Sequence, residues 1–542
     1  MQYIFKHILM RDAVYDMQLQ RRLRELHRRA AAAYQTLYGD DLEPYYADLV
    51  YHYHHAGNLE QERRYAALAG KEEAKIGSHE TAVDFFTRAL ELTPADDVEA
   101  RYDLLMAREA SLNLHGAREA QTADLEELAQ LVGLSDPQAE VTHNDWAVAV
   151  TLRQAQYAEA VSDYEAAIEA AQRALRFTQA ANDRIGEARA RDVWGGALYR
   201  QGDYAAAQKQ CQQGVKAALA AGSSPAALAA LAQNWNGLGA LSSDLGEQEE
   251  AHNYYKQSLA IFQEIGDQLG VSLCLNELGK VADILRDPDT ARRYYEQSLH
   301  ITKKVGYQRG TGTCLVNLGV LANDLGDQTA ARAYYEQSLS LFREINDQQG
   351  VSICLNNLGN VSKHFADYAA AQTYYEQSIV VSEKIGDLLG VSICFNELGD
   401  LALLQANPNG AVNYYMKALD IHKKVNLPYY LVEDYAGLAQ AALVLEDKAK
   451  ALSYAERVVV YLQENPSLDG AENPMRVFRF VWQVLAALAD ARAEDVLTVA
   501  ARAIQERADN IPDPAQRQMY LDQPHHRLLW AGWMARSATS HK

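Results

Sequence analysis

A pattern that recurs at one constant interval constrains the fold of this chain more than any other feature. The stretch "GVSICLNNLGN" that begins at Gly350 recurs as "GVSICFNELGD" from Gly390 and as "GVSLCLNELGK" from Gly270. Three further sets keep the same step: Gly239, Gly279, Gly319, Gly359 and Gly399; Ala251, Ala291, Ala331, Ala371 and Ala411; and the tyrosine pairs from Tyr254-Tyr255 to Tyr414-Tyr415. A period of this length predicts a solenoid of stacked units.

Each unit of the repeat is predicted to form two helices. In the unit from Val271, apolar and small residues follow helical spacing, "LRDPD" breaks the pattern, and a second stripe begins at Ala291. Gly279 and Ala291 are small enough to let the two helices approach closely, and Tyr295 fills the space beside them. The two stripes consist of Leu275, Leu278, Gly279 and Ala282, and of Ala291, Tyr295, Ser298 and Leu299.

Weaker copies of the pattern flank the regular ones. They include "ETAVDFFTRALELTP" from Glu80, "QYAEAVSDYEAAI" from Gln156, "GDYAAAQKQCQQGV" from Gly202 and "YAGLAQAALVLEDKAKALSYAERVV" from Tyr435. We therefore expect an all-α chain of roughly ten or eleven helix pairs. Four segments are predicted: a helical linker over residues 1–40, divergent repeats over 41–230, regular repeats over 231–425, and divergent repeats with a helical cap over 426–542.

The order of residues within a unit resembles the tetratricopeptide repeat, in which Leu-Gly is followed by Ala, an aromatic residue and a small residue. In one unit these places are Leu278-Gly279, Ala291, Tyr295 and Ser298. The period is longer than the usual one and is similar to that of kinesin light chain and the Pins/LGN scaffold family. The resemblance implies a right-handed superhelical solenoid that binds proteins or peptides on its concave face.

The two ends resemble parts of the large bacterial signalling ATPases of AAA or STAND type, which are linked to nucleotide cyclase or transcription-regulator domains. The stretches "FKH", "RDAVYD", "RRLRELHRR" and, near the other end, "NIPDPAQRQMYLDQPHHRLL" carry this resemblance. The sequence contains no G-x-x-x-x-G-K-[ST] phosphate loop. We therefore expect the C-terminal sensor region of a longer protein, with a stand-alone relative as the alternative.

Composition narrows the classes of function. The net charge of −21 disfavours binding to nucleic acid or to an anionic membrane surface, and would suit a basic partner. Charges near the N-terminus leave no signal-peptide core, and the five cysteines include no close pair. We expect a cytoplasmic, non-catalytic protein without a cofactor.

Three sets of potential metal ligands have simpler interpretations. The cysteines that recur at the interval of the repeat, Cys274, Cys314, Cys354 and Cys394, are held too far apart for a disulfide or a zinc site, so buried packing is favoured. His52 and His55 in "YHYHHAGN" could share a helical face and bind a metal, but packing within a repeat helix is again favoured. The same applies to His525 and His526.

A polar stripe beside the packing stripe is the predicted binding site. Its first position is Asn in four of the five regular units, and an amide that both donates and accepts can hold a peptide backbone of any sequence. The alternative is that asparagine bridges neighbouring helices. The predicted groove residues are Asn236, Asn276, Asn356, Asn396, Lys280, Asn360, Asp400, Asp283, Asn323 and Lys363.

The expected function is a protein- or peptide-binding scaffold that serves as the sensor or regulatory region of a signalling ATPase. Its partners would be a protein or peptide on the concave face and an N-terminal NTPase domain of the parent protein. Self-assembly into oligomers and sensing of a small ligand inside the solenoid are the alternatives. An enzyme is the least favoured class.

Overall fold

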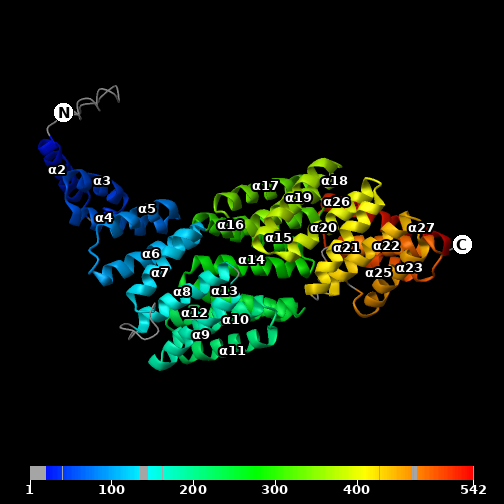
Figure 1. The fold of residues 1–542 in the computed structure, drawn as a ribbon, viewed down its shortest axis with the longest axis horizontal. Helices are drawn as coiled ribbons and strands as arrows, with labels where there is room; N and C mark the ends of the chain where they lie inside the picture. Colours follow the sequence, from blue (N-terminus) through cyan, green and yellow to red (C-terminus); the bar gives the residue numbers. More distant parts are fainter. Residues whose placement is uncertain are drawn as a thin grey trace, which may run out of the picture. The chain divides into compact units, whose positions relative to one another are not determined.

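The computed structural model describes residues 20–540 except 40, 135–143, 162, 426–427, 467, 469–470 and 472. Within these residues the chain forms 26 α-helices and one short 3₁₀-helix, with no strand (Figure 1). The all-α array predicted from the repeat is confirmed. Residues 1–19, which hold "FKH" and "RDAVYD", lie outside the described part.

The chain divides into two compact units. Unit 1 comprises Met1–Cys274 and His300–Gln308, and unit 2 comprises Leu275–Leu299 and Arg309–Lys542. The helices of unit 1 are α2 (Gln20–Tyr38), η1 (Glu43–Tyr45), α3 (Tyr46–Ala56), α4 (Leu59–Lys75), α5 (His79–Glu91), α6 (Val98–His115), α7 (Arg118–Leu131), α8 (Asn144–Ala160), α9 (Tyr164–Ala181), α10 (Arg184–Arg200), α11 (Tyr204–Ala220), α12 (Pro225–Asp244) and α13 (Gln248–Ile265). Two helices contain residues of both units, α14 (Gln268–Ile284) and α15 (Pro288–Lys304).

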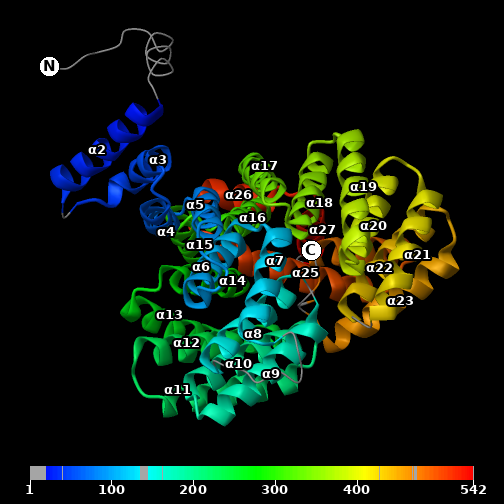
Figure 2. The ribbon, with the colours of Figure 1, turned by 60° about the vertical axis from the view of Figure 1, so that its left-hand side comes forward.

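Unit 2 continues the same succession of helices (Figure 2). Its helices are α16 (Gln308–Asp324), α17 (Gln328–Glu344), α18 (Gln348–His364), α19 (Tyr368–Ile385), α20 (Leu388–Leu404), α21 (Pro408–Val425), α22 (Pro428–Val444), α23 (Lys448–Glu464), α24 (Pro474–Ala487), α25 (Arg492–Asp509), α26 (Pro514–Leu521) and α27 (Pro524–Ser540). Ten successive pairs run from α4–α5 to α22–α23, and α24–α25 makes an eleventh. The remaining described helices, α2–α3 and α26–α27, lie outside these pairs.

The helices begin where the sequence places a capping carboxylate. Along the regular repeats, Asp267, Asp287, Asp327, Asp347, Asp367 and Asp387 each accept a backbone N–H from three residues ahead, at 2.9 to 3.1 Å. Asn407 does the same for Gly410 at 3.0 Å. The residue before each of these caps has a positive φ, which ends the preceding helix. The capping residues follow one another at a constant interval in the sequence, except at one position. This interval sets the length of the helices.

The two helices of a regular pair meet at the glycine and the tyrosine that recur in every regular unit. A Cβ placed on Gly359 would lie 2.4 Å from Cε1 of Tyr375, and the other pairs give 2.4 to 2.8 Å. Tyr375 is fully buried, as is Ala371 one turn before it. Only a residue without a side chain therefore allows the second helix to place its ring against the first.

A buried serine adds a polar link between the two helices of a pair. Ser258, Ser338 and Ser378 donate to the carbonyl oxygens of Ala232, Gly312 and Ser352, at 2.8 to 2.9 Å. Each acceptor lies 26 residues earlier in the chain. The small residue of the repeat is thus both a spacer and a hydrogen-bond donor to a helix backbone.

In unit 2 the C-terminal helices return to repeats that lie far earlier in the sequence. One buried cluster joins Leu318, Leu321 and Leu325 to Ile511, Tyr520 and Leu529. A Cβ on Gly326 would lie 2.6 Å from the carbonyl oxygen of Met519. Figure 2 shows α26 next to α16. Helices α24 to α27 are therefore part of the core of unit 2.

Candidate functional site: the inner polar stripe

The predicted groove residues all lie on first helices of their pairs and are divided between the two units. Asn236 stands on α12 in unit 1, and the others stand on α14, α16, α18 and α20 in unit 2. Their surroundings separate them into three groups: amides that contact the next repeat, side chains bonded to the C-terminal helices, and side chains paired within the repeats.

The asparagines and the cysteines of the pattern are partners across neighbouring repeats. Within unit 1, Sγ of Cys274 lies 3.7 Å from Oδ1 of Asn236. Within unit 2, the pairs Cys314–Asn276 and Cys394–Asn356 lie at 3.8 and 3.4 Å. In each case the cysteine follows the asparagine by 38 residues. The cysteine and the asparagine, which recur separately in the sequence, therefore contact each other between one repeat and the next.

The thiols themselves are held in hydrogen-bonding surroundings. All five cysteines are buried and unbridged. Cys394 also lies 3.3 Å from Oγ of Ser378, and burial raises its pKa to about 12. Because thiolate is the reactive form, these thiols are suited to packing and not to chemistry.

Several amide and carboxylate groups of the stripe are already bonded within the repeats. Asn276 accepts from Asn317 at 2.8 Å. Asn396 is only 3% exposed, and its Oδ1 makes no hydrogen bond to any described residue. Asn360 accepts from the hydroxyl of Tyr375 at 2.8 Å. Asp400, at the same position of the next repeat, accepts from Tyr415 at 2.6 Å in the same manner. The lysine Lys280 pairs with Glu277 on its own helix at 2.8 Å.

The C-terminal helices bond to the far end of the stripe in unit 2. Arg507 of α25 contacts Asp283 twice, at 2.5 Å to the carboxylate and 2.7 Å to the carbonyl oxygen. Gln523 donates to the carbonyl oxygens of Asn323 and Asp324, at 3.3 and 2.7 Å. These contacts join residues about 200 or more positions apart.

A cluster of buried charged side chains lies at the other end of the unit 2 stripe. Arg476 of α24 is fully buried, 3.0 Å from Asp400 and 2.8 Å from Glu433. Burial opposes ionisation of Asp400, but the positive charges of Arg476 and Lys363 outweigh it and lower the pKa of Asp400. Lys363 also pairs with Glu397. The unit 2 stripe therefore already carries a complement of partners from its own chain.

Unit 1 has an open pocket at equivalent positions. Asn236 precedes the buried Ala251 by 15 residues; Asp192 and Leu152 precede the buried Ala207 and Ala167 by the same number. Leu152 and Asp192 border a pocket of about 380 Å³ on α6, α8, α10 and α12, and Asn236 stands three residues after the lining residue Gln233. The pocket is lined by Met106, Ala149, Leu152, Arg153, Gln156, Arg189, Asp192, Val193 and Gln233.

The two arginines of this pocket differ in their surroundings. Arg189 is exposed, and no ion pair joins it to another described residue. Arg153 is one-third exposed and lies 3.5 Å from the buried Glu109. Burial, with a smaller contribution from Glu159, raises the pKa of Asp192 from its ordinary value of 3.8 to about 7. Sequence reasoning missed these residues because the first helices of unit 1 do not repeat one another's polar residues.

Several of the histidines have partners within the fold, whereas Nδ1 of His525 is buried and makes no hydrogen bond to any described residue. His52 lies 2.9 Å from His27, and His54 lies 2.9 Å from the buried Glu62. His526 donates through Nδ1 to the carbonyl oxygen of Tyr520 at 2.8 Å. Among the residues that the structure describes, no group of three or more His, Cys, Asp or Glu side chains is arranged to hold a metal ion.

Comparison with known families follows the regular part of the array. Residues 228–304, 271–344 and 351–424 match the family model described as "Tetratricopeptide repeat". These segments are tetratricopeptide repeats. No curated protein sequence matches the chain. Within the described residues, no helix has the length and apolar character needed to cross a membrane.

Solved structures of other helical-repeat chains are similar to this one at low sequence identity. BtubC (BKLC) from P. vanneervenii is 20% identical, with a TM-score of 0.34, over 45% of this chain and 93% of that chain. The quorum sensor NprR from B. thuringiensis, in its apo form, is 16% identical, with a TM-score of 0.47, over 65% and 97%. A Rap protein complexed with Competence and Sporulation Factor is 12% identical, with a TM-score of 0.46, over 73% and 99%.

Proposed function

We propose that this chain is a non-catalytic scaffold that binds a protein or peptide, and that the inner stripe of unit 1 is its primary binding surface. Stacked helix pairs present their first helices as an extended inner surface. The observation that supports unit 1 is the open pocket that carries Arg189, Gln156 and Gln233 at successive first helices. In unit 2 the corresponding stripe is bonded to Arg476 of α24 and Arg507 of α25.

The chemistry of the pocket favours an extended segment with an acidic side chain. A guanidinium group binds carboxylate through paired N–H donors, and Arg153 and Arg189 stand on neighbouring first helices, α8 and α10. The amides of Gln156 and Gln233 can hold backbone groups beside it. The chain as a whole is acidic, so these two arginines would select the ligand locally and not through its overall field.

The predicted stripe of unit 2, which includes Asn356 and Lys363, is proposed as a second surface. It would become available to a partner only if the C-terminal helices released Asp283 and Asp400. We further propose that the chain serves as the regulatory region of a signalling ATPase. In that case nucleotide turnover by the parent protein would change when this region is removed, and identical turnover would contradict the role.

Affinity capture from a cell extract tests the binding surface. The Arg153→Gln/Arg189→Gln variant is compared with Asn276→Ala/Asn356→Ala/Asn396→Ala. Arg332→Gln serves as a control because Arg332 is exposed and pairs with Glu336 on its own helix. We expect the arginine variant to lose a partner that wild type and control retain, with helicity by circular dichroism unchanged. Retention of every partner by the arginine variant, with loss in the asparagine variant, would assign binding to unit 2 instead.

A further inference from the structure

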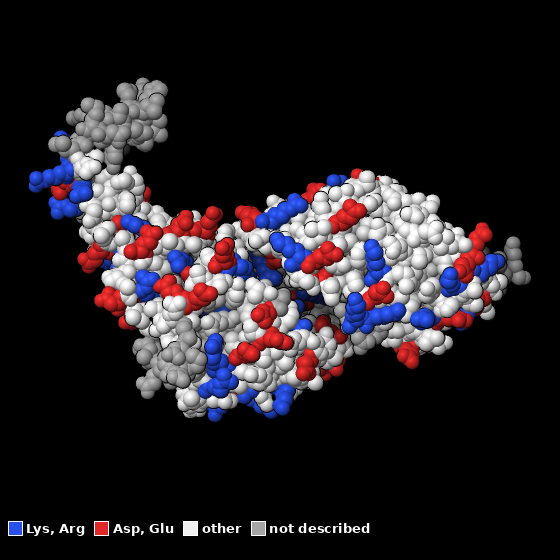
Figure 3. Space-filling view, viewed as in Figure 1, with Lys and Arg blue, Asp and Glu red and all other residues white. Residues whose placement is uncertain are grey.

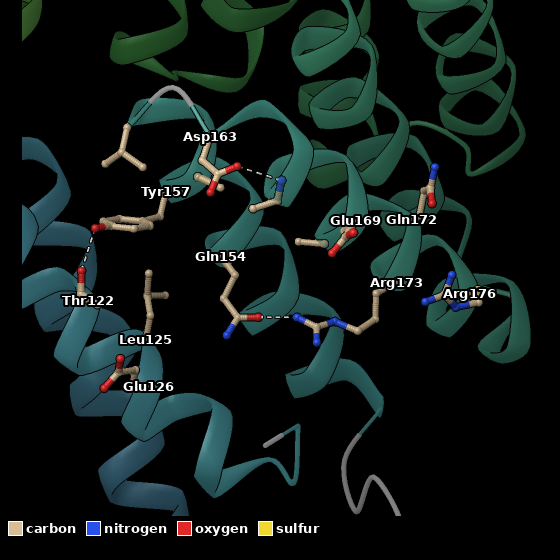
Figure 4. A pocket seen from close by; sticks show the side chains of 14 residues that line it. Thr122, Leu125, Glu126, Gln154, Tyr157, Asp163, Glu169, Gln172, Arg173 and Arg176 are labelled. Carbon is tan, nitrogen blue, oxygen red and sulfur yellow. Dashed lines mark hydrogen bonds between the residues drawn. The ribbon is translucent and has the colours of Figure 1, made fainter. Parts of the chain in front are cut away.

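A second pocket in unit 1 lies apart from the inner stripe. It has a volume of about 600 Å³, and its walls come from α7, α8 and α9 (Figure 4). This pocket shares no residue with the pocket at Arg153 and Arg189. Ligand sites in proteins commonly measure about 300–1,000 Å³, so its size suits a small organic molecule.

One end of the pocket presents an arginine that keeps unused hydrogen-bond donors. Nη2 of Arg173 donates to Oε1 of Gln154 at 2.7 Å, while its Nε is buried and makes no hydrogen bond to any described residue. No ion pair joins Arg173 to another described residue. Burial lowers the pKa of Arg173, the neighbouring charge of Arg176 lowers it further, and the carboxylate of Glu169 offsets part of this effect. The guanidinium has further N–H donors beyond the one bonded to Gln154, and an anion in the pocket would accept from them and offset the cost of burying the charge.

The other end is apolar. Leu125 and Ala158 are buried beneath it, and Val161 at its edge is 43% exposed. The ring of Tyr157 adds to this wall, and its hydroxyl is bonded to Thr122 at 2.7 Å (Figure 4). The wall can take an apolar group without leaving a polar atom unpaired.

Three carboxylates limit the charge of a ligand. Glu126, Asp163 and Glu169 also line the pocket, and Asp163 is occupied in capping α9 through the N–H of Ala166 at 3.1 Å. Their negative charges disfavour a phosphate or another multiply charged anion. A single negative charge on an apolar body fits the arrangement better.

We infer that the α7–α9 pocket binds a small organic monoanion, a carboxylate on a compact apolar body, with Arg173 contacting the carboxylate and Leu125 and Val161 contacting the body. The site is independent of the proposed peptide surface, because the two pockets use different side chains.

Saturation-transfer NMR and calorimetric titration with 4-phenylbutanoate test the inference, with 4-phenylbutanamide as the neutral counterpart. We expect the acid to bind at least about 10-fold more tightly than the amide, because a hydrogen bond to a charged group is at stake. Arg173→Gln should weaken the acid by a similar factor and leave the amide unchanged. Arg332→Gln is the matched control.

Ala166→Leu provides a second test that keeps the charge and fills the space, with circular dichroism to confirm the fold. It should abolish binding of the acid. Equal binding of acid and amide, no binding of either, or full binding by both variants would overturn the inference.

Discussion

The inner stripes of the two units are built on the same kind of helix pair. They differ in which parts of the chain contact them. In unit 1 the stripe ends in an open pocket, where Arg189 is exposed. In unit 2 the equivalent face is met by α24–α27, which contact Asp283, Asn323 and Asp400. We therefore propose that a polar stripe on this array serves as a ligand surface only where the chain does not bond to it.

The surroundings of the charged side chains are part of this difference between the two inner faces. Figure 3 shows acidic and basic side chains interspersed over the visible face, with basic side chains gathered at α2. Inside unit 2 the charges are instead buried in pairs, such as Arg476 with Asp400 and Glu433. Buried pairs are sensitive to the loss of one partner, whereas exposed ones contribute little. The predictions below use this difference.

Replacement of Arg476 by methionine should have the largest effect. It would leave the buried Glu433 without its arginine and the buried Asp400 with only Lys363, at a cost of about 3–5 kcal/mol. Hydrogen exchange followed by mass spectrometry should show faster exchange in α20, α22 and α24, with unit 1 unchanged. The control Arg332→Met should alter neither unit. Faster exchange in both units would mean that the two inner faces do not differ in the way described.

Acid should weaken unit 2 through His526. Burial lowers the pKa of His526 to about 4, whereas in the unfolded chain it has its ordinary value of 6.5. Between these values the unfolded state binds a proton that the folded state does not, so stability falls as pH drops from 6.5 to 4, by up to about 3 kcal/mol. Thermal unfolding across this range measures the loss. His526→Gln should flatten the dependence, and an unchanged slope would contradict the assignment.

Substitution of Gly359 by alanine should destabilise a regular repeat. The added Cβ would lie 2.4 Å from the ring of Tyr375, and such overpacking costs about 1–3 kcal/mol. The matched change in unit 1, Gly239→Ala, gives 2.8 Å and should cost less. Melting temperatures rank the two variants. Adding Tyr375→Leu to Gly359→Ala should cost less than the sum of the two single changes, and strict additivity would argue against a steric clash.

Asp192→Asn should have the smallest effect, and it should be stabilising. Because the pKa of Asp192 is raised to about 7, the folded state keeps a proton that the unfolded state loses above its ordinary value of 3.8. Stability therefore decreases as pH rises between these values. Partial exposure screens the charge, so the gain at pH 8 should be about 1 kcal/mol. The melting temperature should rise at pH 8 and change little at pH 4; a loss at pH 8 would show that the ionised group is needed.

Much of the fold follows from residues that lie within one repeat. The capping Asp347 and Asp367 set where helices begin, and Gly359 with Tyr375 determines how a pair meets. Each of these relations is shorter than the interval of the repeat, so a single copy displays it. The buried position of Cys354 could be predicted for the same reason.

The partnership of Asn356 with Cys394 was not predicted, although both positions were visible. Their side chains meet across the boundary between repeats, and a periodic sequence shows that two positions recur without showing that they touch. The peptide-binding role of the asparagines stays a prediction, because an amide with one partner keeps further hydrogen-bonding capacity.

By itself the sequence determined the period, the helix pairs and the packing positions, because local spacing and steric fit decide them. Only the tertiary structure decided which inner face is open. The contacts of Arg507 with Asp283 and of Gln523 with Asn323 join residues 224 and 200 positions apart. No periodic signal marks such pairs, because neither residue departs from the pattern of its own segment. Each gains its role only from a contact with a distant part of the chain.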